Sequence, residues 1–168
     1  MPAASILAFE PHPAHLIQLA QNLAVNQLTA RVTVVPRAAG IANGRVFLSD
    51  AGEVSRIYDQ PADGRIGVER TDFFTTIGPR PIDILKLDCE GGEYDLIMDT
   101  RFATLAVAAI VLEWHAAPTL PDAEVRLHER LKALGFEVEG WAGQTSGASR
   151  SGMLWAYAGA SRAAEVAR

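Results

Sequence analysis

The segment Pro81–Asp88 (PIDILKLD), with Gly91-Gly92 soon after it, limits the fold of this chain more than any other part of the sequence. Its apolar and β-branched residues predict a buried strand. The two glycines permit a tight turn, and Tyr94–Met98 fits the start of a helix. A buried strand that leads directly into a helix is typical of α/β proteins, in which helices cover a sheet.

Strand and helix patterns alternate along the rest of the chain in the same way. Further strands are predicted at Ser5–Phe9, Val32–Val35, Arg45–Leu48, Ala108–Glu113, Phe136–Trp141 and Met153–Tyr157. Helices are predicted from Pro13 to about Asn26 and from Pro121 to Leu134, with Gly135 as the cap of the second. This order predicts an α/β fold with a largely parallel sheet and helices on both faces of the sheet.

Two regions depart from this alternation. Asp50–Gly67 is rich in Gly, Asp and Pro and has little periodicity, so we expect a long loop or a short lid there. A Gly/Ser-rich segment instead of a helix joins the last two strands, so we expect them to form an antiparallel edge. Residues 159–168 are expected to be a loosely held tail, which leaves residues 1–158 as one domain.

Composition excludes several classes of protein. Apolar residues make up 49% of the 168 residues and charged residues 21%, as in ordinary globular proteins. The net charge of −5 offers no basic field, so nucleic acid is not expected as a partner. We find neither a signal peptide nor an apolar run of roughly 18 to 20 residues, so no membrane is expected either. With a single cysteine, Cys89, these features predict a cytoplasmic protein.

Acidic side chains follow three of the predicted strands. Glu10 follows the first strand, Asp88 and Glu90 follow the PIDILKLD strand, and Glu113 with His115 ends the AAIVLE strand. In open α/β sheets ligands bind outside the carboxyl ends of the strands, so these are candidate site residues. Glu10 suits the two hydroxyls of a ribose, with a solvated acid as an equal alternative. His115 could take a proton from a substrate hydroxyl or bind a metal, although a histidine with neither role is commoner.

The residues around Asp88 also have structural interpretations. Lys86 and Asp88 point to the same face of the strand and predict an ion pair, which would stabilise a lysine that is otherwise costly to bury. Cys89 lies between two acids that raise the pKa of its thiol, so we do not expect a nucleophile. The spacing of the acids does not fit an EF-hand loop, so we expect no dedicated calcium site and assign no metal ligands.

Taken together, these segments resemble the FkbM-type methyltransferases. The resemblance rests on Ala8–Pro13 (AFEPHP), on Asn22 and Asn26, and on Asp83–Glu93 (DILKLDCEGGE). Val111–His115 (VLEWH) is similar to the acid-containing fifth strand of that family, and Val68–Phe73 resembles the lead into its fourth strand. The resemblance covers roughly residues 5 to 140.

The resemblance implies a class I methyltransferase (Rossmann-like) fold that uses S-adenosylmethionine, most often for O-methylation of a small molecule or a sugar. The cofactor-binding residues it implies are Glu10 at the ribose, with Pro11 beside it, Arg37 and Ala38 near the adenine, and Asp88 at the methionine end. The residues it implies on the side of the methyl acceptor, with catalytic roles, are Glu90, Glu113 and His115.

The family opens with a strand and a glycine-rich turn that precede the AFEP segment, whereas this chain begins only a few residues before that segment. We therefore expect an N-terminally truncated sheet. One alternative is a non-catalytic module whose sheet is completed by a second copy or a partner chain. A third hypothesis, a metal-dependent hydrolase that uses Asp88, Glu90 and His115, has suitable residue types without supporting spacing.

Overall fold

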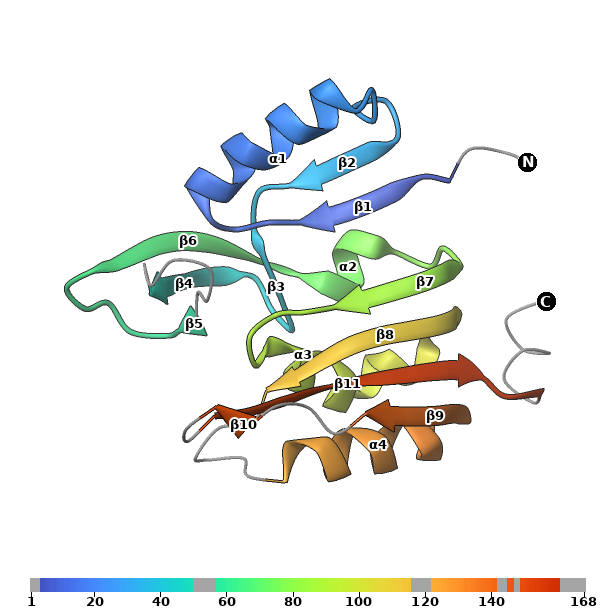
Figure 1. The fold of residues 1–168 in the computed structure, drawn as a ribbon. Coiled ribbons are helices and arrows are strands. Elements are labelled where there is room, and N and C mark those ends of the chain that lie inside the picture. Colours follow the sequence, from blue (N-terminus) through green and yellow to red (C-terminus); the bar gives the residue numbers. More distant parts are fainter. Residues whose placement is uncertain (1–3, 50–56, 116–121, 142–144, 147–148, 161–168) are drawn as a thin grey trace. The chain divides into compact units, whose positions relative to one another are not determined.

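The computed structural model describes residues 4–49, 57–115, 122–141, 145–146 and 149–160 (Figure 1). The chain divides into two compact units, Met1–Phe73 and Phe74–Arg168, and each unit is described by itself. Within the described ranges, no helix combines the length and the apolar character needed to cross a membrane.

The first unit begins with a strand–helix–strand element that matches the predicted one. Strands β1 (Ile6–Phe9) and β2 (Val32–Val35) pair in parallel, with Ile6 opposite Val32. Helix α1 (Pro13–Val25) connects them. His12 caps this helix, because its Nδ1 atom accepts a hydrogen bond from the Ala14 amide at 3.2 Å. Proline at the first helical position supports the same start, since it has no amide proton to leave unsatisfied.

A mixed four-stranded sheet completes the first unit. Its strands are β3 (Ala38–Gly40), β4 (Gly44–Ser49), β5 (Ile57–Tyr58) and β6 (Arg65–Asp72), in the order β3-β6-β4-β5. Strand β4 runs antiparallel to both β5 and β6, while β3 runs parallel to β6. Its core consists of Ala38, Val46, Leu48 and Val68, packed against Ile57 and Ile66.

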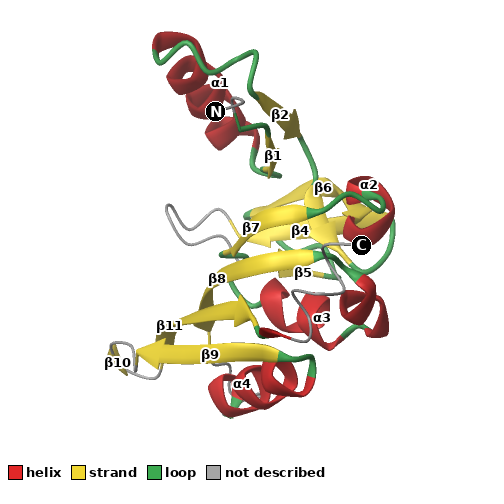
Figure 2. Ribbon diagram, turned by 90° about the vertical axis from the view of Figure 1, so that its right-hand side faces the viewer, coloured by secondary structure: helices red, strands yellow, loops and turns green. Residues whose placement is uncertain are grey.

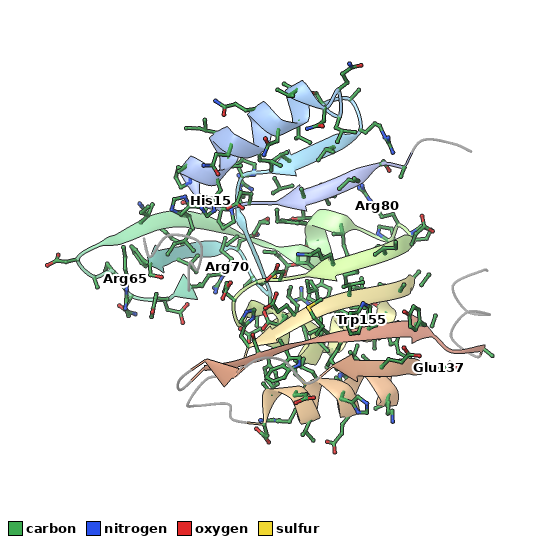
Figure 3. The ribbon with its side chains drawn as sticks, in the orientation of Figure 1. His15, Arg65, Arg70, Arg80, Glu137 and Trp155 are labelled. Atoms are coloured by element: carbon green, nitrogen blue, oxygen red, sulfur yellow. The ribbon has the colours of Figure 1, made fainter. Side chains whose placement is uncertain are left out.

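The prediction of a loop over Asp50–Gly67 is therefore wrong for β5 and for the start of β6. These short strands exist because they pair with β4, a contact that local periodicity does not reveal. Arg65 on β6 also lies over the ring of Tyr58 on β5, 3.5 Å from its centroid, and this contact links the two strands on either side of β4 (Figure 3). Residues 50–56 of the expected loop lie outside the described residues.

The second unit is built on another mixed sheet. Its strands are β7 (Ile82–Leu87), β8 (Val107–His115), β9 (Phe136–Trp141), β10 (Thr145–Ser146) and β11 (Ser149–Ala158). Among the described strands of this unit, β7 and β8 pair in parallel, and β11 runs antiparallel to β8, β9 and β10. The prediction of a largely parallel sheet is thus corrected to α/β with mixed sheets. The antiparallel pairing of the last strands, β9 with β11, is confirmed, and β11 lies between β8 and β9 (Figure 1).

The predicted helices α3 (Gly92–Met98) and α4 (Ala123–Ala133) both pack against β8 and against each other (Figure 2). Beneath them, alternate residues of the strands are buried, such as Leu112 at 0% exposure. Two residues of the opposite face, Ile84 and Tyr157, are 68% and 47% exposed. In the described part of this unit, α3 and α4 therefore cover one face of the sheet, and the expected cover on both faces is not observed there. Pro121, the predicted start of α4, lies outside the described residues.

The one-turn helix η1 (Thr100–Thr104) links α3 to β8, and its cap gives a testable pH dependence. Asp99 accepts hydrogen bonds from the Arg101 amide at 2.8 Å and from the Arg101 Nη2 atom at 2.8 Å. The bonds from Arg101 hold the pKa of this carboxyl below its ordinary value of 3.8. The stability that the charged form contributes is therefore present above that value and is lost as the pH falls through the folded-state pKa.

We expect Asp99→Asn to lower the free energy of unfolding by about 1 kcal/mol at neutral pH, because asparagine can cap the turn but cannot pair with the guanidinium. The deficit should shrink below about pH 4. Urea unfolding at pH 7 and pH 3, followed by tryptophan fluorescence, measures both values. Asp83→Asn, at an exposed position near the start of β7, is the control, and an equal deficit at both pH values would contradict the assignment.

Candidate functional site

The turn from β7 to α3 has an unusual backbone. Glu90 adopts a φ of 51° and Gly91 a φ of 108°, and both values lie in the left-handed region. Glycine suits that region, but for a residue with a side chain it costs roughly 1–2 kcal/mol. Because strain of this kind accumulates at functional sites, Glu90 marks this turn as a candidate site.

Glu93, in the first turn of α3, ties this turn to the end of β8. Its side chain is 1% exposed. The Gly91 amide donates to Glu93 Oε2 at 2.9 Å, and the His115 amide donates to Oε1 at 3.1 Å. The His115 Nδ1 atom lies 3.3 Å from the same Oε1. The sequence placed Glu93 at the helix start but gave no sign of this bond to a strand end that lies 22 residues away.

His115 is the centre of a cluster that we name the acidic corner, which comprises Asp88, Glu90, Glu93, Glu113 and His115. Its Nε2 atom lies 3.4 Å from Glu90 Oε2 and 3.7 Å from Glu113 Oε1. The hydrogen bond with Glu93 raises the pKa of His115, although burial opposes the rise. Burial raises the pKa of Glu90, and the His115 charge offsets part of that rise. Perturbed groups of this kind favour a binding or catalytic role.

Asp88 borders the acidic corner and pairs with Lys86 as expected. The Lys86 Nζ atom donates to Asp88 Oδ2 at 2.8 Å. The lysine side chain is 66% exposed, however, so burial is not the reason for the pair. An exposed pair of this kind contributes little to stability. The Asp88 side chain is itself 38% exposed, so its carboxylate is accessible to solvent.

Cys89 lies between Asp88 and Glu90 without a chemical role of its own. Burial raises the pKa of its thiol to about 11, and the charges of Glu93 and Asp88 add to the effect. A thiol with this pKa holds almost no thiolate at neutral pH. The prediction that Cys89 is not a nucleophile is supported, with burial as a larger cause than the neighbouring acids.

Glu10, the predicted ribose ligand, follows β1 in the first unit. The His12 amide donates to its Oε1 atom at 2.8 Å, and His15 Nδ1 lies 3.7 Å from the same oxygen (Figure 3). The side chain is 27% exposed, and among the described residues no donor lies on Oε2. The carboxylate is therefore fixed through one oxygen and can accept hydrogen bonds from a ligand through the other.

The other cofactor-binding residues predicted in this unit differ in accessibility. Pro11 is half-buried and Arg37 is exposed. Ala38 is 1% exposed as a whole residue in the core of the four-stranded sheet, so neither its side chain nor its backbone is open to a ligand there. The predicted catalytic residues Glu90, Glu113 and His115 lie together with Asp88 in the acidic corner of the second unit.

Comparisons with known proteins agree with this fold. Residues 2–138 match the family model of the methyltransferase FkbM domain. A comparison with curated proteins finds no significant match. Among solved structures, the chain is similar to a methyltransferase FkbM from Methylobacillus flagellatus KT, with a TM-score of 0.59 and 16% identity over 91% of this chain. The chain spans only 36% of the length of that protein.

A second solved structure, a precorrin-6y C5,15-methyltransferase from Geobacter metallireducens GS-15, gives a TM-score of 0.50 and 19% identity. The similarity covers 94% of this chain and 70% of that one. At these identities the two structures support the fold alone, and the family assignment rests on the matched residues 2–138.

Proposed function

Because this chain belongs to the methyltransferase FkbM domain family, we propose that it transfers the methyl group of S-adenosylmethionine to a hydroxyl of a small molecule or sugar. The acidic corner carries the proposal, since it gathers acids and a histidine where β7 and β8 end. Ligands bind at this end of the strands in open α/β sheets. The parallel pair β7–β8, joined through α3, also favours a Rossmann-like layout.

Residues of the first unit suit the cofactor. S-adenosylmethionine supplies a methyl group that its sulfonium has already activated. Glu10 would hold the ribose, because its free carboxylate oxygen can accept hydrogen bonds from the ribose hydroxyls. Arg37, which is exposed, would lie near the adenine, and Pro11 would lie beside Glu10 at the ribose.

Residues of the acidic corner suit the acceptor. Methyl transfer to a hydroxyl needs alignment of the oxygen and removal of its proton. We assign to Glu113 the role of the base that accepts the proton of the acceptor hydroxyl. Its side chain is 38% exposed and therefore open to a ligand. Glu90 and His115 would position the hydroxyl, since Glu93 fixes the histidine ring.

Calorimetric titration with S-adenosylmethionine tests the cofactor site. We expect Glu10→Ala to weaken binding by about tenfold or more, because a hydrogen bond to a charged group contributes roughly 1.5–3 kcal/mol. Glu69→Ala, an exposed glutamate on β6, is the matched control and should bind as the unchanged chain does. Equal affinities of the Glu10→Ala and Glu69→Ala variants would contradict the assignment of Glu10.

The second candidate function is a non-catalytic module completed by a second copy or a partner chain. One observation favours it: within the described residues of the second unit, β7 pairs only with β8, and an unpaired strand edge can accept another chain. The same titration separates the two candidates. Binding of S-adenosylmethionine by the isolated chain supports the enzyme, whereas no binding at millimolar cofactor favours the module.

A further inference from the structure

Three side chains of the acidic corner have potential metal-ligand atoms that lie close together. Asp88, Glu90 and His115 each offer one such atom, and the three atoms lie within 4.8 Å of one another. Two ligands at about 2.1 Å from the same ion are at most about 4.2 Å apart, so small side-chain rotations would bring all three onto one ion. The side chains are partly exposed, which leaves room for that adjustment.

The orientation of His115 is an independent observation that points to a cation. Histidines that bind metals usually donate the other ring N–H to a carboxylate, which fixes the ring and its tautomer. Glu93 is placed to accept that bond from Nδ1, and its burial keeps the pair together. When Nδ1 carries the single ring proton, the Nε2 lone pair faces Glu90 Oε2 at 3.4 Å. Either a proton on Nε2 or a metal cation between the two atoms then compensates the charge of Glu90.

The charge of the acidic corner leads to the same conclusion. Its members include four carboxylates, those of Asp88, Glu90, Glu93 and Glu113. Lys86 neutralises part of one of them from an exposed position. Partly buried carboxylates that lie close together are costly without compensating charge. A divalent cation would supply two positive charges at the point where the carboxylates converge.

We propose that Asp88, Glu90 and His115 bind one divalent cation of the manganese or magnesium type. Two carboxylates and one imidazole suit such ions, and three protein ligands leave coordination positions open. The role of the ion rests on the proposed function: it would bind the acceptor oxygen and make its proton more acidic. The O–H bond would break, with its proton passing to the Glu113 carboxylate. The electron pair left on oxygen would form the new O–CH3 bond while the C–S bond of the sulfonium breaks, and the bonding pair of that bond would leave with sulfur as neutral S-adenosylhomocysteine.

Sequence spacing did not support this site, because two of its ligands follow one strand and the third ends another. The acid spacing also does not fit an EF-hand loop, so the sequence analysis assigns no metal ligands. The parallel register of β7 and β8, in which Leu87 lies opposite Leu112, brings the two strand ends together. Backbone pairing therefore creates the ligand set.

The test is titration of the full chain with manganese chloride after removal of metals by a chelator, with free Mn²⁺ measured by electron paramagnetic resonance. We expect one ion per chain. His115→Gln and Glu90→Gln should each weaken binding by about tenfold or more, as loss of a ligand does. The matched controls His128→Gln and Glu129→Gln, on α4, should bind as the unchanged chain does. Circular dichroism shows whether each variant is folded.

Two results would overturn the proposal: no binding of Mn²⁺ at millimolar concentration, or binding that the His115→Gln and Glu90→Gln variants retain while folded. Titration with S-adenosylmethionine in the presence and absence of Mn²⁺ separates this site from the proposed function. Cofactor binding without Mn²⁺ binding would remove the metal site and leave the methyltransferase. Mn²⁺ binding without cofactor binding would support the metal site and contradict the proposed methyltransferase function.

Discussion

Glu93→Gln is expected to lower the free energy of unfolding of the second unit by about 2 kcal/mol, through loss of hydrogen bonds to a buried charged acceptor. Glutamate presents two acceptor oxygens, one to the Gly91 amide and one to His115. Glutamine has a single carbonyl oxygen, so its amide group must face one of these donors. A buried donor is then left unsatisfied, which costs more than the bond itself contributes.

Urea unfolding followed by tryptophan fluorescence measures this effect in the correct unit, because Trp114, Trp141 and Trp155 all belong to the second one. Glu129→Gln on α4 is the control, since that glutamate is exposed and the substitution is the same. If both variants unfold at the same urea concentration, the Glu93 carboxylate does not hold the turn to β8.

Leu112→Ala is expected to cost about 3 kcal/mol, as is typical when a fully buried leucine is replaced and leaves a cavity. Leu112 lies in the middle of β8 at 0% exposure, beneath α3 and α4. It pairs with Leu87 on one side and Leu154 on the other, and both of these are also buried. The surrounding side chains belong to three strands and two helices, so the site cannot collapse easily around alanine.

Val111→Ala is the matched control, because Val111 neighbours Leu112 but points to the opposite face of the same strand. Val111 is only half-buried, and it lies opposite Trp155 of β11 (Figure 3). We expect a cost of about 1 kcal/mol or less, in line with the smaller apolar area that the substitution exposes. Equal costs in urea unfolding would mean that both faces of this sheet are covered.

Much of the local structure follows from the sequence. The predicted strands at Val32–Val35 and Phe136–Trp141 agree with the observed ones to the residue, and α1 begins at Pro13 as expected. These elements are predictable because their signals are local: β-branched runs, helical spacing, and proline or glycine at the ends. The AFEP and DILKLDCEGGE segments identified the family on the same local basis, and the family match confirms that assignment.

The direction of the strands needed information that the sequence does not carry locally. Each strand pattern predicts that a strand exists, but its neighbour depends on which apolar faces can pack together. For this reason the sheets proved to be mixed instead of largely parallel, and β5 and the start of β6 lie where a loop was expected. The candidate site residues could be predicted, because they directly follow strands in the sequence and ligands bind at the carboxyl ends of strands.

The sequence by itself determined the α/β class, the family and the presence of acids at the ends of β7 and β8. Only the tertiary structure decided that Glu93 is buried and bonded to His115, and that Nε2 of this histidine faces Glu90. The physical reason is that a hydrogen bond across 22 residues depends on the register of β7 against β8 and on the packing of α3 over them. No local pattern specifies this register or this packing. Together they bring the acids at the two strand ends into one site with a defined geometry.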